Sequence, residues 1–153
     1  MKRWERGTFN TLVLMVAASG FAYLWMKYAL DTDDPFAVVN HPWQTMVFDL
    51  HLLASPALVL MFGIVFNSHV MKKFRASGLP NRRSGYVSLG TFSAMVVSGY
   101  LLQVSANEAW LKTLVVLHVG SGTIFAVAYG AHLVISYTLA RRQQPAAAMR
   151  GVA

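Results

Sequence analysis

The sequence contains no cysteine and few charged residues, and both absences narrow what the protein can be. Without thiolates the chain lacks the ligands for an iron–sulfur cluster or a thiolate zinc site, and it cannot carry out dithiol redox chemistry. Charged residues make up 12% of the 153 residues, whereas a soluble domain averages about 25%. The composition therefore suits lipid better than water.

Hydrophobic residues account for 56% of the chain and gather in long runs. A helix needs about 20 apolar residues to cross roughly 30 Å of hydrocarbon. The first run is too long for a signal-peptide core, and no clean cleavage site follows it, so we expect it to be retained. We predict an all-α integral membrane four-helix bundle over residues 1–142 and a disordered tail at 143–153. The four runs predict transmembrane helices at about 9–30, 45–71, 86–105 and 110–139.

The basic residues predict how the chain is oriented in a membrane. Its formal net charge is +7, and the lysines and arginines gather before the first run, after the fourth run and in the 72–85 connection. The other two connections carry acidic residues. The positive-inside rule then places both termini and the 72–85 connection in the cytoplasm, as in a bacterial inner membrane protein. This pattern explains the charge better than nucleic-acid binding does. The connections are also too short for a catalytic domain, so substrate chemistry would need another chain.

The second half of the chain resembles the first. The segments ASGFAYLW and VSGYLLQV each place an aromatic residue after Ser-Gly, and each following hydrophobic run has a histidine near its start, His51 or His118. The repeat predicts two helical hairpins, 1–75 and 82–142, with the same orientation in the membrane.

Four of the five histidines lie in hydrophobic runs, and they form two pairs. The step of 18 residues from His51 to His69 makes five helical turns, and the step of 14 from His118 to His132 falls about 40° short of four turns. Each helix therefore presents both imidazoles on one face, about 27 Å and about 21 Å apart along the axis. The same face of the last run carries Gly122, where a flat macrocycle would have room.

Pairs of imidazoles at two depths suit haem. A porphyrin supplies four equatorial nitrogens and needs only axial ligands from the protein, whereas zinc or copper needs three or four converging ligands. We predict two bis-histidine haem b groups, bound by His51 and His118 on the periplasmic side and by His69 and His132 on the cytoplasmic side. The alternative is four structural histidines that hydrogen-bond between helices. Ionisable groups inside a bilayer are more often functional.

The helix number, the spacing of the last two histidines and the Ser-Gly elements resemble the four-helix di-haem b-type cytochrome subunits of respiratory enzymes. Examples are the gamma subunit of formate dehydrogenase and the cytochrome b subunit of nickel–iron hydrogenase. The resemblance covers about residues 9–140 and implies that His51, His118 and His132 are axial ligands. In those subunits the remaining ligand comes from the first helix, which has no histidine here, so His69 would replace it. The resemblance also implies electron transfer between a membrane quinone and a dehydrogenase, an iron–sulfur protein or a c-type cytochrome.

Further residues are candidates for secondary roles. Arg82 and Arg83 could pair with haem propionates, although the same charges can serve only as topology determinants. A quinone site needs a proton acceptor at the lipid boundary, for which Asp49, His41 and Gln44 are candidates. Two other functions stay open: a small transporter or channel component with a histidine-lined proton or metal path, and a haem-free membrane anchor for a partner.

Overall fold

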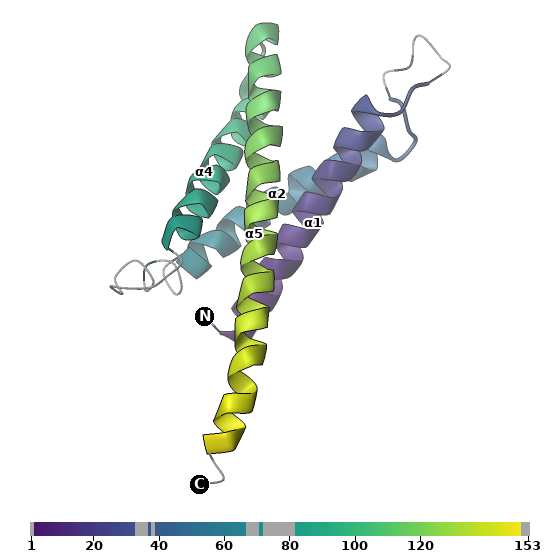
Figure 1. The fold of residues 1–153 in the computed structure, drawn as a ribbon. Coiled ribbons are helices and arrows are strands. Elements are labelled where there is room, and N and C mark those ends of the chain that lie inside the picture. The colour runs from purple at the N-terminus through teal and green to yellow at the C-terminus, as the bar shows by residue number, and fades with distance from the viewer. Residues whose placement is uncertain (1, 33–36, 38, 67–70, 72–81, 151–153) are drawn as a thin grey trace. The chain divides into compact units, whose positions relative to one another are not determined.

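The structure is a computed structural model. It describes residues 2–32, 37, 39–66, 71 and 82–150, with side chains included except at 82–85 and 139–150. The secondary structure in these ranges is helical (Figure 1). Each helix contains a stretch long and apolar enough to cross a membrane. The helices are α1 (Arg3–Tyr28), α2 (Gln44–Val65), α4 (Arg82–Val104) and α5 (Glu108–Arg150).

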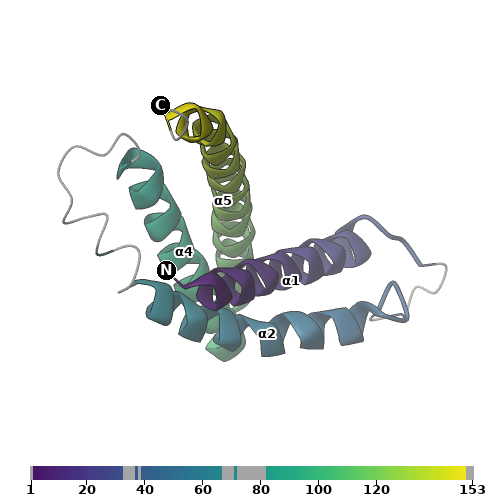
Figure 2. The same ribbon diagram turned by 90° about the horizontal axis from the view of Figure 1, so that it is seen from below.

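The chain divides into two units, Met1–Leu79 and Pro80–Ala153, and each is a helical hairpin. In the first unit, which we call hairpin 1, α1 packs against α2. In the second unit, hairpin 2, α4 packs against α5. Figures 1 and 2 show each pair side by side from two directions. This division confirms the two hairpins expected from the sequence repeat.

Polar side chains define several helix ends. The Glu5 carboxylate accepts a hydrogen bond from the backbone N–H of Lys2, the residue before α1, at 2.8 Å. The helix therefore begins at Arg3, six residues before the hydrophobic run expected from residue 9. Asn107 caps α5, because its side-chain oxygen accepts from the backbone N–H of Trp110 at 3.1 Å. Such caps satisfy N–H groups that have no partner within the helix.

The far end of α5 differs from the expectation. The helix continues to Arg150, so the segment from residue 143, expected as a disordered tail, is helical to that point. The sequence there contains two glutamines and three consecutive alanines, which have high helix propensity and flank Pro145, which disfavours a helix. Low hydropathy after the apolar run therefore marked the end of the membrane-compatible stretch and not the end of the helix.

Each hairpin buries one narrow seam between its helices. In α1 the buried positions 9, 13 and 16 are spaced by four and three residues, which keeps one helix face against a neighbour. Large apolar side chains off the seam are exposed within their hairpin, as Leu53 is at 77%. The buried apolar residues are Phe9, Val13, Val16, Met26, Ala54, Leu58, Met61 and Val65 in hairpin 1, and Phe92, Leu114 and Phe125 in hairpin 2.

Candidate functional site

His51 on α2 lies against the backbone of α1. Its Nδ1 atom is 3.0 Å from the carbonyl oxygen of Val16 and 3.3 Å from the hydroxyl oxygen of Ser19. A carbonyl oxygen can only accept a hydrogen bond, so Nδ1 carries the proton in this arrangement. The lone pair of the neutral ring then lies on Nε2.

His118 on α5 makes the same contacts with α4. Its Nδ1 atom is 3.0 Å from the carbonyl oxygen of Met95 and 3.4 Å from the hydroxyl oxygen of Ser98. The ring is therefore held in the same tautomer as that of His51. Both rings are half-buried.

A glycine in the preceding helix allows each ring to approach. A Cβ atom on Gly20 would lie 2.9 Å from Cε1 of His51, and one on Gly99 would lie 2.9 Å from Cε1 of His118. Real Cβ atoms essentially never come this close to another heavy atom. Any larger residue would therefore push the ring or the helix away.

The two sets of contacts are related by the internal repeat. The histidines are 67 positions apart (51 to 118), and in this register the counterpart of His132 is Val65. We call the carbonyl oxygen, serine and glycine that contact each ring an imidazole cradle. Its members in α1 and α4 are 79 positions apart: Val16 and Met95, Ser19 and Ser98, Gly20 and Gly99.

Gly122 lies on the face of α5 that is turned toward α4. A Cβ atom placed on it would meet the sulfur of Met95 at 3.5 Å, which is ordinary van der Waals contact. That Gly122 leaves room for a flat macrocycle stays a prediction. The glycines in contact with the imidazoles are Gly20 and Gly99, on the preceding helices.

Aromatic rings continue this face of α5. The ring of Phe125 lies 5.3 Å from that of Phe92 on α4, and Tyr129 stacks on Phe125 at 5.7 Å. His132 follows three residues after Tyr129, so it shares this face by helical register and is half-buried. The expectation that one face of α5 carries both histidines agrees with this register.

The structure describes three other candidate residues only in part or not at all. His69 lies outside the described residues. Arg82 and Arg83 are in the first turn of α4, and their side chains are outside the described part. Among the residues that are described, no three His, Cys, Asp or Glu side chains converge as a metal site.

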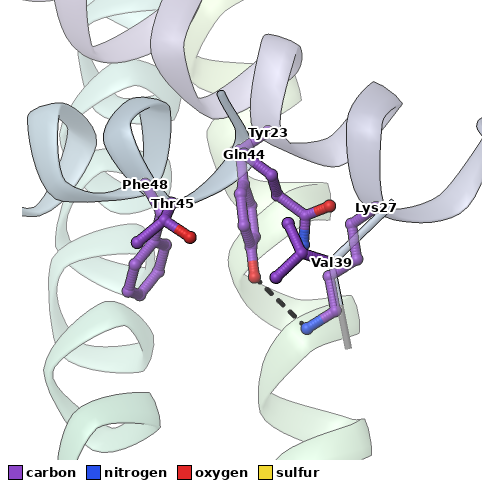
Figure 3. A pocket seen from close by; sticks show the side chains of 6 residues that line it. All are labelled: Tyr23, Lys27, Val39, Gln44, Thr45 and Phe48. Carbon is purple, nitrogen blue, oxygen red and sulfur yellow. Dashed lines mark hydrogen bonds between the residues drawn. The ribbon is translucent and has the colours of Figure 1, made fainter. Parts of the chain in front are cut away.

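A small hollow of about 210 Å³ lies where α1 ends and α2 begins (Figure 3). One of the quinone candidates, Gln44, lines it together with Tyr23, Lys27, Val39, Thr45 and Phe48. The Lys27 amino group donates to the Tyr23 hydroxyl at 3.2 Å, and the rings of Tyr23 and Phe48 lie 4.9 Å apart. The hollow therefore combines hydrogen-bonding groups with two aromatic rings.

The other two quinone candidates lie outside the lining of this hollow. His41 accepts a hydrogen bond at Nδ1 from the backbone N–H of Trp43 at 3.2 Å. Asp49 is exposed on α2.

The sequence repeat contains the signal for the imidazole cradles, but from the sequence the Ser-Gly elements indicate only the duplication and the family resemblance. Their contact with the histidines depends on helix pairing within each hairpin. No protein-family model, curated protein or solved structure matches the chain. The cradle geometry is therefore the main basis for a functional proposal.

Proposed function

We propose that the chain is a di-haem b-type cytochrome subunit of the bacterial inner membrane, which passes electrons between the quinone pool and a partner redox protein. Its helices would form a transmembrane bundle with both termini on the cytoplasmic side, as the distribution of lysine and arginine indicates. One haem b would bind to His51 and His118 near the periplasmic side. The other would bind to His69 and His132 near the cytoplasmic side.

The observation that supports this proposal is the shared environment of His51 and His118. Each ring donates from Nδ1 to a backbone carbonyl of the preceding helix, at 3.0 Å in both cases. Metal-ligating histidines almost always donate their second ring N–H in this way, because the bond fixes the tautomer and orients the ring. Two histidines that make the same hydrogen bonds within apolar helices are better explained as ligands than as structural residues.

The donor set fits haem. Two neutral imidazoles complete the coordination of an iron that already has four porphyrin nitrogens, and each hairpin would contribute one of them. When bound, the haem would supply a one-electron carrier within the bilayer. The carbonyl and serine oxygens of the imidazole cradles would hold each ring in the tautomer that can bind iron through Nε2. They would also keep the Nδ1 proton hydrogen-bonded, so that it is not exposed to lipid. Arg82 and Arg83 would pair with propionates at the cytoplasmic end.

The same proposal places a quinone headgroup near the hollow at the end of α1. Gln44 lines this hollow, and Lys27 and Tyr23 provide donors that can reach a quinone oxygen. Asp49 and His41 would then be candidates for proton transfer at the same membrane boundary. A partner redox subunit would exchange electrons with the haems.

Purification of the full chain in detergent, followed by a pyridine haemochrome assay, tests this function. We expect two haem b groups per chain and a low-spin bis-histidine spectrum. His118→Ala should lose one haem, and added imidazole should restore the low-spin signal. The matched control His41→Ala removes an imidazole that is not one of the four proposed ligands, so it should retain both haems.

Two results would overturn the proposal. A colourless wild-type protein, prepared with haem supplied during expression, would favour a transporter component or a haem-free anchor. Full haem content in all four single variants, His51→Ala, His69→Ala, His118→Ala and His132→Ala, would show that these histidines are not the ligands.

A further inference from the structure

We propose that Ser19 and Ser98 are positioning residues that lower the reduction potential of the iron bound by His51 and His118. This inference rests on the proposed haem function and adds to it the residues that tune the site. Both serines are nearly inaccessible, with 5% and 1% of their surface exposed. Each is followed directly by the glycine that the imidazole contacts.

The first step of the argument concerns the hydroxyl proton of each serine. The Ser19 hydroxyl lies 2.7 Å from the carbonyl oxygen of Met15, and the Ser98 hydroxyl lies 2.6 Å from that of Ala94. Both acceptors are one turn earlier in the same helix. Since a hydroxyl has a single proton, that proton is directed to the helix and the serine oxygen faces the imidazole as an acceptor.

The second step concerns the proton on each imidazole. The Nδ1–H of His51 is shared between the Val16 carbonyl and the Ser19 oxygen, and that of His118 is shared in the same way within its own cradle. Two acceptors on one N–H increase electron density in the ring. A more basic imidazole binds ferric iron more strongly relative to ferrous iron, and the reduction potential falls.

The third step is the space that the glycines provide. Nothing lies within 4 Å of a Cβ atom placed on Gly7 in α1 or on Gly90 in α4, whereas the cradle glycines meet an imidazole at 2.9 Å. The close approach is therefore specific to the position that follows each serine. It brings the ring within reach of both acceptors.

The test compares variants that lose the same kind of helix hydrogen bond. Thr91 on α4 and Thr123 on α5 also donate to carbonyls one turn earlier in their own helices, at 2.8 Å in both cases. Thr91→Ala and Thr123→Ala are the matched controls for Ser19→Ala and Ser98→Ala. The probe is the midpoint potential of the purified full chain, measured by redox titration of the haem absorbance.

We expect Ser19→Ala and Ser98→Ala to keep both haems and to raise the potential of one of them. A threefold change in the ferric–ferrous equilibrium corresponds to about 28 mV, since a tenfold change is 59 mV for one electron. The two controls should not change either potential. Ser19→Thr retains a hydroxyl and should recover the wild-type value. Equal potentials in all variants, or equal shifts in the controls, would overturn the proposal.

A second measurement needs no haem. In the haem-free chain in lipid nanodiscs, ¹⁵N chemical shifts of the labelled imidazoles report which ring nitrogen carries the proton. We expect an Nδ1–H tautomer for His51 and His118 in the wild type, and a larger Nε2–H population in Ser19→Ala and Ser98→Ala. An unchanged tautomer would overturn the positioning role. If the wild type binds no haem, the proposed function and its redox tuning both fail, and this measurement still decides the positioning role.

Discussion

Gly99 and His118 lie so close together that a Cβ atom on the glycine would be 2.9 Å from Cε1 of the imidazole. The ring is held there by hydrogen bonds from Nδ1 to two groups of α4. A side chain at position 99 would therefore have to break these bonds or separate the two helices.

Gly99→Ala should destabilise hairpin 2. Overpacking of a tight contact costs about 1–3 kcal/mol in the free energy of unfolding, which outweighs the roughly 0.5–1 kcal/mol that alanine gains over glycine within a helix. Denaturant unfolding in detergent micelles, followed by circular dichroism, measures the difference. Gly90→Ala is the matched control on the same helix, because nothing lies within 4 Å of its Cβ. It should be neutral or slightly stabilising, and equal losses in both variants would contradict the contact.

Asn40→Asp should loosen the end of α1. The Asn40 amide group donates to the carbonyl oxygens of Lys27 at 3.0 Å and Leu30 at 2.9 Å, and a carboxylate cannot replace those donors. Loss of two hydrogen bonds is expected to cost about 1–3 kcal/mol locally. Hydrogen exchange should accelerate in the last turn of α1. Asn107→Asp is the control, since that side chain acts only as an acceptor for Trp110 and aspartate keeps the acceptor. Faster exchange at both sites would argue against this explanation.

Phe125→Ala should weaken the pairing of α4 with α5. Phe125 and Phe92 are 5% and 3% exposed and their rings are in contact, so truncation leaves a cavity. Comparable changes in packed cores cost roughly 3–5 kcal/mol. The neighbouring residue Ile124 is 52% exposed within its hairpin, and Ile124→Ala should cost much less. Thermal unfolding in the same micelles compares the two variants, and similar melting temperatures would show that the aromatic contact is not important for stability.

Hydropathy predicted the helices well, because four apolar runs separated by polar connections allow few other arrangements. The expected start at 45 and the observed start of α2 at Gln44 differ by one residue. The largest difference is at α5, which extends to Arg150 beyond its apolar run. Helix propensity there is independent of hydropathy, so a method based on apolar length could not detect the extension.

The candidate site was predicted only in part. His51 and His118 could be selected from the sequence, since histidine is unusual in an apolar run and helical periodicity gives its face. Gly122 lies against Met95, and the room that it would leave for a macrocycle stays a prediction. Haem ligation, including the pair of His69 and His132, stays a prediction.

Composition, the spacing of histidines and the duplicated Ser-Gly were enough to establish an apolar helical chain made of two similar hairpins. Each of these three features is visible in the order of residues along the chain. The partners of each imidazole could be recognised only from the packing of α1 on α2 and of α4 on α5. A hydrogen bond between residues 35 positions apart, such as that of His51 with Val16, depends on the rotation and depth of two helices against each other. Those quantities arise from the whole interface and are not encoded at either residue alone.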